Sequence, residues 1–225
     1  MAVIECIDVK KTYRSGQVDV NALRGVSLAI EQGEFVALTG PSGCGKTTLL
    51  NIIGGLDRPK SGDVCVEGQS LNDLGNSDLA DLRLRRIGFI FQAYNLVPVL
   101  SGLENVEFIM QLQGVGRADR RRRASEVLAS VGLAEVQARR PAELSGGQQQ
   151  RVAVARALAS NPAIILADEP TANLDSRTSQ ALLELMRELN EKENLTLVVA
   201  SHDPKVLEFV RRHVTVVDGR IHSDT

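Results

Sequence analysis

Gly40-Pro41-Ser42-Gly43-Cys44-Gly45-Lys46-Thr47 is the stretch that decides the fold of this 225-residue chain. It matches the pattern G-x-x-x-x-G-K-[ST] of glycine-rich phosphate loops. An apolar run, Phe35–Thr39, precedes the loop and predicts a buried strand, and residues 46–56 predict a helix closed by two glycines. A strand, a glycine-rich loop and a helix in this order predict a site for a triphosphate, the alternative being a fortuitous glycine turn.

Each residue type in the loop has a chemical task. Glycines leave room for backbone N–H groups to converge on phosphate oxygens, and the helix adds the positive end of its dipole. We expect Lys46 to reach the β and γ phosphates, a gross Coulomb attraction of ~5 kcal/mol at ~3 Å and an effective dielectric of ~20. Thr47 offers a hydroxyl oxygen to Mg²⁺. The residues expected to bind the triphosphate in this loop are Gly40, Pro41, Ser42, Gly43, Cys44, Gly45, Lys46, Thr47 and Thr48.

Two acids follow a second apolar run. Residues 164–167 predict a strand, and Asp168 and Glu169 come directly after it, where a carboxylate can lie beside a metal at the carboxyl edge of a parallel sheet. We expect Asp168 to hold Mg²⁺ through water. Glu169 is expected to polarise the attacking water, a role worth typically 10²- to 10⁴-fold in rate. The alternative is a helix N-terminal charge pair.

His202 and Gln92 also follow predicted strands. His202 comes shortly after Thr196–Ala200, and Gln92 directly follows Ile87–Phe91, so both are expected at the same sheet edge. His202 is expected to bind the γ phosphate, and Gln92 to bind Mg²⁺ or water; alone, either residue type is ordinary in a loop. The predicted catalytic residues are Lys46, Gln92, Glu169 and His202, and the predicted metal ligands are Thr47, Gln92 and Asp168.

The order of these segments predicts an α/β fold with a mostly parallel sheet, as in a P-loop NTPase core. Residues 4–13 and 22–30 alternate like antiparallel edge strands, broken by a turn at Arg14-Ser15-Gly16, and predict an added N-terminal β subdomain. Residues 93–160 show helical spacing and predict an inserted helical subdomain. We expect one domain over 1–225, its nucleotide-binding core formed by 1–92 and 161–225.

Composition narrows the class of protein. The chain has 26 Lys and Arg against 28 Asp and Glu, and this net charge of -2 indicates no general attraction to nucleic acid. No apolar stretch approaches the roughly 20 residues of a membrane span. Cys6, Cys44 and Cys65 share no metal-ligand spacing and are typical of reduced cytoplasmic thiols. The run at 120–123 is interpreted as a solvated helix face, with a basic docking patch as the alternative.

Leu144-Ser145-Gly146-Gly147-Gln148-Gln149-Gln150-Arg151 contains LSGGQ, the defining signature of the ABC ATPases, and the whole chain resembles that family. The resemblance implies an aromatic adenine platform, a Q-loop, a Walker B acid pair, a D-loop and a switch histidine. In this sequence the matching residues are Tyr13, Gln92, Asp168 with Glu169, Asp175 and His202.

The signature has a physical interpretation as a second phosphate site. Ser145, Gly146 and Gly147 precede a helical run predicted over 148–159, so their N–H groups, with Gln148, lie at its positive dipole end. The family implies that each signature covers ATP bound to the opposite subunit. We therefore expect a head-to-tail dimer with two ATP molecules, in which residues 171–175, ending at Asp175, cross the interface.

The resemblance also implies a separate integral membrane permease, bound through residues 92–106, on the cytoplasmic face of the inner membrane. Residues 51–57, 139–144 and 166–176 most resemble the bacterial subgroup for lipoprotein release and macrolide or peptide export. The alternatives are an amino-acid importer, a soluble ABC protein acting on DNA or in translation, and a regulator without turnover. Cys44 and Thr47 stand where many relatives have serine, and Ala172 where glycine is frequent; none removes a needed donor.

Overall fold

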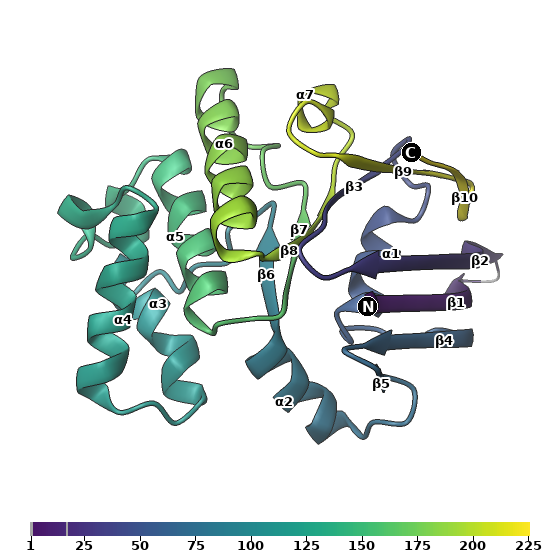
Figure 1. Cartoon of the computed structure of the whole chain (residues 1–225), viewed down its shortest axis with the longest axis horizontal. Coiled ribbons are helices and arrows are strands. Elements are labelled where there is room, and N and C mark those ends of the chain that lie inside the picture. The colour runs from purple at the N-terminus through teal and green to yellow at the C-terminus, as the bar shows by residue number, and fades with distance from the viewer. Residues whose placement is uncertain (1, 17) are drawn as a thin grey trace.

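The computed structural model describes residues 2–16 and 18–225 and arranges them as two sheets and a group of helices (Figure 1). The chain belongs to the α/β class, as predicted. The elements of the sheets are β1 (Ala2–Ser15), β2 (Val18–Glu31), β3 (Phe35–Thr39), β4 (Ser61–Val66), β5 (Gln69–Ser70), β6 (Ile87–Phe91), β7 (Ile164–Asp168), β8 (Thr196–Ala200), β9 (Arg212–Val217) and β10 (Arg220–Asp224). The helices are α1 (Lys46–Ile53), α2 (Asn76–Arg86), α3 (Gly102–Leu112), α4 (Arg117–Ser130), α5 (Gly146–Ala159), α6 (Ser176–Glu193) and α7 (Pro204–Leu207), with 3₁₀ turns η1 (Ala134–Val136) and η2 (Pro141–Glu143).

The larger sheet has the strand order β10-β9-β3-β8-β7-β6. Strands β9, β3, β8, β7 and β6 run parallel to their neighbours, and β10 adds an antiparallel edge. Three predicted strands are confirmed with their bounds, and the strand predicted at 164–167 extends by one residue to Asp168. The sequence did not predict β9 and β10.

Alternate residues of the central strands bury opposite faces of this sheet, as the two-residue period of a strand requires. One face packs against the helices α3 to α6, and the other packs against α1 and the smaller sheet. Phe35, Ala37, Ile165, Ala167, Leu197 and Val199 belong to the first core, and Val36, Leu38, Ile164, Leu166, Val198 and Ala200 to the second. A strand buried on both faces is apolar throughout, which is why these runs were visible in the sequence.

The smaller sheet is antiparallel, in the order β2-β1-β4-β5, and confirms the predicted N-terminal β subdomain. The predicted turn at Arg14-Ser15-Gly16 is wrong for its first two residues. Arg14 pairs with Asp19 and Ser15 with Val18, so the β1–β2 ladder continues through them. Backbone pairing with β2 outweighs the turn preference of these residue types.

Residues 93–160, all described, contain α3, α4, α5, η1 and η2 and no strand, as predicted. These helices lie together on the far side of the large sheet from β1 and β2 (Figure 1). The helix predicted at 46–56 ends at Ile53. Gly54 packs against Phe89, whose Cε1 would lie 2.6 Å from an added Cβ, and Gly55 has a left-handed φ of 62° that ends the helix.

The arginine run 120–123 lies on α4 and is largely partnered. Arg120 and Arg121 form ion pairs with the buried Glu107 of α3, and Arg122 pairs with acids on its own helix. This arrangement favours a helix surface over a docking patch. Among the residues that the structure describes, no helix is both long and apolar enough to cross a membrane.

Candidate active site

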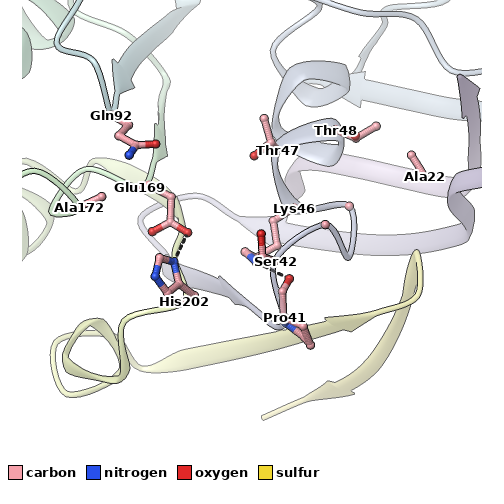
Figure 2. A pocket seen from close by; sticks show the side chains of 12 residues that line it. Ala22, Pro41, Ser42, Lys46, Thr47, Thr48, Gln92, Glu169, Ala172 and His202 are labelled. Atoms are coloured by element: carbon pink, nitrogen blue, oxygen red, sulfur yellow. Dashed lines mark hydrogen bonds and ion pairs between the residues drawn. The ribbon is translucent and has the colours of Figure 1, made fainter. Parts of the chain in front are cut away.

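An open cavity of about 650 Å³ lies where the phosphate loop faces the carboxyl ends of β6, β7 and β8 (Figure 2). Parallel strands end at the same edge of a sheet, which brings residues distant in the sequence together here. The lining residues are Ala22, Pro41, Ser42, Gly43, Gly45, Lys46, Thr47, Thr48, Gln92, Glu169, Ala172 and His202. All of them except Ala22 and Ala172 were predicted site residues.

The phosphate loop needs glycine where it passes close to other backbone. Gly40 has φ 136°, and an added Cβ would lie 2.0 Å from the carbonyl oxygen of Val216. Gly45 has φ 111°, and an added Cβ would lie 2.6 Å from the carbonyl oxygen of Ala22. Larger residues would push the loop away from β2 and β9, so these glycines hold the loop in place.

Lys46, the charged residue of the loop, is buried, with 7% of its surface exposed. Its Nζ donates to the carbonyl oxygens of Gly40 at 2.7 Å and Pro41 at 3.0 Å, and lies 3.8 Å from Sγ of Cys44. The loop is thus closed around an ammonium group. Gly40 and Cys44, both predicted to bind phosphate, are not among the described residues that line the cavity.

Thr47 and Asp168 bring two oxygen ligands together. Thr47 Oγ1 donates to Asp168 Oδ1 at 3.1 Å. Burial of Asp168, and next the charge of Glu169, raise the pKa of this carboxyl, while the bond from Thr47 and the charge of Lys46 act against them. Hydroxyl and carboxylate oxygens suit Mg²⁺.

These two residues fit a cation that also takes phosphate and water ligands. Among the described residues, no group of three or more His, Cys, Asp or Glu could hold a metal ion. Mg²⁺ commonly keeps several waters and binds through one or two protein ligands plus substrate phosphates. The donor set is therefore compatible with magnesium bound together with a nucleotide.

Glu169 is held by two neighbours at the end of β8. Its Oε1 lies 2.7 Å from Nδ1 of His202 (Figure 2). Its Oε2 accepts from Oγ of Ser201 at 3.1 Å. Its backbone has φ 47°, a left-handed conformation that costs a non-glycine residue about 1–3 kcal/mol. Strained residues of this kind are concentrated at functional sites, so the conformation supports the importance of this carboxylate.

Gln92 lines the cavity, and the segment after it is tied to two other parts of the chain. Its carbonyl accepts from Nδ2 of Asn173 at 2.9 Å, in the segment that follows β7. Arg156 of α5 donates to the carbonyls of Tyr94 at 2.9 Å and Asn95 at 2.5 Å, and burial lowers the pKa of Arg156. The segment after Gln92 is therefore linked to the last turn of α5.

The signature residues form the start of α5 and lie outside the lining of the cavity in the described chain. Ser145 is the N-cap, and it exchanges two hydrogen bonds with Gln148, Oγ accepting from N at 3.3 Å and N donating to Oε1 at 3.0 Å. An added Cβ on Gly147 would lie 2.3 Å from Cγ2 of Thr178, so α6 packs closely here. One chain thus carries its phosphate loop and its signature at different places.

Two further predicted site residues contact other groups. Tyr13 is 39% exposed, and its hydroxyl donates to Asp57 Oδ2 at 2.7 Å. Asp175 is the N-cap of α6, where its carboxylate accepts from the amides of Arg177 and Thr178 at 3.0 Å and from Oγ1 of Thr178 at 2.6 Å. Neither lines the cavity among the described residues, and their nucleotide roles stay predictions.

Sequence reasoning missed three residues of the site. Ala22 and Ala172 line the cavity, and Ser201 holds Glu169. Ser201 had a usable signal, because it directly precedes His202 at the end of a strand. A small residue such as Ala22 carries no chemical signal, and only its position beside the loop makes it part of the site.

Comparisons with known proteins agree with this geometry. Residues 23–172 match the ABC transporter family. The macrolide export ATP-binding/permease protein MacB of Syntrophobacter fumaroxidans is 49% identical over 100% of this chain, which spans 32% of that longer protein. The lipoprotein-releasing system ATP-binding protein LolD of Geobacter metallireducens is 45% identical over 99% of both chains.

A solved structure has the same fold. It is the ATP-binding cassette MJ0796 of Methanocaldococcus jannaschii, a dimer in a post-hydrolysis state bound to ADP and Pi. The similarity has a TM-score of 0.91 and 45% sequence identity, and covers 99% of this chain and 97% of that chain.

Proposed function

Because the chain belongs to the ABC transporter family and is one of its ATP-binding subunits, we propose that it works as a dimeric ATPase motor for a membrane permease. The observation that carries the proposal is the separation of two phosphate-binding elements on one chain. The phosphate loop lines the cavity, whereas Ser145, Gly146, Gly147 and Gln148 lie at the start of α5 outside it. A second copy, docked head to tail, can bring its signature to the open cavity of the first.

The residues of the cavity then divide the work of hydrolysis. Lys46, held by the carbonyls of Gly40 and Pro41, exchanges these partners for the β and γ phosphate oxygens. Thr47, Asp168 and Gln92 hold Mg²⁺, which neutralises charge on the phosphates when bound. Glu169 orients the attacking water and accepts its proton, a contribution of roughly 10²- to 10⁴-fold.

His202 has two tasks in this proposal. Its Nδ1 bonds Glu169, which leaves the opposite side of the ring for the γ phosphate. The open first turn of the partner's α5 supplies the remaining positive potential, because the amides at a helix start have no partner within the helix. The N-cap bond from Gln148 N to Ser145 Oγ uses one of these amides, and those of Gly146 and Gly147 remain for phosphate.

The permease is proposed to bind the surface next to Gln92. Val99, Phe108 and Leu112 are exposed apolar side chains on or before α3, and the Gln92 segment is linked through Arg156 to α5. A push on this surface can therefore reach the last turn of α5, the helix that begins at the signature. We propose that residues 93–160 act as the helical subdomain that moves against the core of 1–92 and 161–225, at the cytoplasmic face of the inner membrane.

The similarity to MacB and LolD favours export or lipoprotein release as the task of the assembly. The chain spans about a third of the macrolide export protein, so the permease part of the proposed assembly is a separate chain or segment. Nucleic acid is not among the proposed partners, given the net charge of -2.

The test is light scattering after size-exclusion chromatography on Glu169→Gln, with and without Mg-ATP. The variant keeps the phosphate loop and loses the general base, so we expect no turnover and a monomer that becomes a dimer only with ATP. The control is Glu169→Gln combined with Lys46→Ala, which should stay monomeric. A Glu169→Gln protein that hydrolyses ATP at the normal rate, or a dimer that forms equally without ATP, would contradict the mechanism.

A further inference from the structure

Asp57 joins two residues of strand β1. Its Oδ1 accepts from Nζ of Lys11 at 2.5 Å, and its Oδ2 accepts from the hydroxyl of Tyr13 at 2.7 Å. Lys11 donates also to the carbonyl oxygen of Arg58 at 2.7 Å. Both oxygens of one carboxylate are therefore used, and the Tyr13 ring is held at its hydroxyl end.

The ammonium of Lys11 covers one face of the Tyr13 ring. Nζ lies 5.0 Å from the ring centroid, within the range of a cation–π contact. The side chain of Lys11 is only 14% exposed, whereas Tyr13 is 39% exposed. Because Lys11 covers one face of the ring, a flat ligand that stacks on Tyr13 would have to use the opposite face.

Asp57 also ties this ring to the phosphate loop. The amides of Leu56 and Asp57 bond the carbonyl of Asn51 on α1 at 2.8 and 3.1 Å, and α1 begins at Lys46. Thr48, which lines the cavity from the first turn of α1, lies close enough to the Tyr13 hydroxyl to act on its pKa. The ring therefore has a defined position relative to the phosphate cradle.

The titration of these groups agrees with the geometry. Burial acts to raise the pKa of Asp57, but the hydrogen bonds from Lys11 and Tyr13 outweigh it, and the net shift is downward. Burial, and next the bond to Asp57, raise the pKa of Tyr13 against the opposing bond from Thr48. Asp57 thus stays charged and Tyr13 stays a neutral donor.

We infer that Lys11 and Asp57 are positioning residues. Through the contacts above they hold the Tyr13 ring in the orientation in which the purine base of the nucleotide stacks on it. The inference rests on the proposed function, because it deepens the role of Tyr13 at the same site. If the inference is right, the contacts among Lys11, Asp57 and Tyr13 contribute to the affinity for the base of the nucleotide and not to the affinity for its phosphates.

The experiment compares two ligands on the full chain by calorimetry in the presence of Mg²⁺: ATP, and inorganic tripolyphosphate, which lacks the base. The variants are Lys11→Met, Asp57→Asn and Tyr13→Phe, the last of which keeps the ring and removes its anchor. Lys10→Met is the matched control, since Lys10 is a neighbouring exposed lysine paired with Asp8. We expect ATP affinity to fall about 3- to 10-fold in Lys11→Met and Asp57→Asn, the size of an aromatic stacking contact, and less in Tyr13→Phe.

Tripolyphosphate affinity should be unchanged in all three variants, and Lys10→Met should bind both ligands like the wild type. Equal losses for ATP and tripolyphosphate would overturn the inference, because the network would then support the loop and not the base. Unchanged ATP affinity in Lys11→Met and Tyr13→Phe would overturn it as well. A wild-type chain that binds neither ligand would contradict the proposed function itself, which the tripolyphosphate measurement distinguishes from a failure of the network.

Discussion

Nδ1 of His202 lies 2.7 Å from Oε1 of Glu169, and the two residues lie side by side in the lining of the cavity (Figure 2). Ser201 Oγ holds the other carboxylate oxygen at 3.1 Å. Ser201 and His202, which follow β8, therefore orient the carboxylate of Glu169, which follows β7. This contact makes His202 a positioning residue for Glu169 as well as a candidate phosphate ligand.

His202→Ala should lower kcat for ATP by at least about 10²-fold, because Glu169 loses a fixing contact and the phosphate loses a ligand. The Kd for ATP should change much less, since Lys46 and the loop remain. His222→Ala is the matched control, an exposed histidine on the edge strand β10, and should keep full activity. Steady-state ATPase assays with a separate binding titration make the comparison, and an unchanged kcat would remove both roles of His202.

Lys46→Ala should weaken ATP binding by more than about tenfold, because a charge-assisted contact to phosphate is lost. Lys46 also holds the carbonyls of Gly40 and Pro41, so the loop should loosen and exchange its amide hydrogens faster. Lys60→Ala, at an exposed lysine, is the control. Nucleotide titration and hydrogen exchange test the two effects separately, and wild-type affinity would count against the phosphate cradle.

Asp168→Asn should raise the thermal stability of the nucleotide-free chain and lower the stabilisation by Mg-ATP. The pKa of Asp168 is raised above its ordinary value of 3.8, so the folded state disfavours the charged carboxylate. That penalty is absent below the ordinary pKa, where the group is protonated in both states, and appears as the pH rises through the raised folded pKa.

The melting temperature of Asp168→Asn minus that of the wild type should therefore grow as the pH rises from below the ordinary pKa of 3.8 through the raised folded pKa. The amide oxygen can still accept from Thr47, so this bond does not confound the comparison. Melting curves with and without Mg-ATP are the measurement. A variant less stable than the wild type at neutral pH would show that the charge is stabilised in the fold and would remove the argument for a cation there.

Asp175→Ala should lower the melting temperature of the chain, because the carboxylate caps the first turn of α6. Asp175→Asn keeps a capping oxygen and should retain most of the stability. Made in the Glu169→Gln background, the same two variants test the proposed interface role. If Asp175 acts only as a cap, ATP-dependent dimerisation of the folded Asp175→Asn protein will match that of Glu169→Gln, whereas a contact across the interface predicts a weaker dimer.

The sequence predicted the central strands of the large sheet more accurately than the strands at its β10 edge. Strands β6 and β8 were predicted with their bounds because both of their faces are buried, and a doubly buried strand is apolar throughout. Strands β9 and β10 were not predicted, since β9 begins with Arg212 and His213, and β10 alternates exposed and half-buried residues. Ser15 was assigned to a turn by its residue type, and pairing with Val18 kept it in a strand.

The sequence by itself determined the family and the candidate residues for the chemistry, because the phosphate loop and the signature are local patterns whose backbone geometry depends on residues next to one another. Only the tertiary structure decided which of these residues meet. Glu169 and His202 are 33 positions apart and Lys11 and Asp57 are 46 positions apart, and each pair meets through the packing of separate elements. Strand order and packing arise from burial summed over the whole chain, and no short stretch of residues encodes that sum.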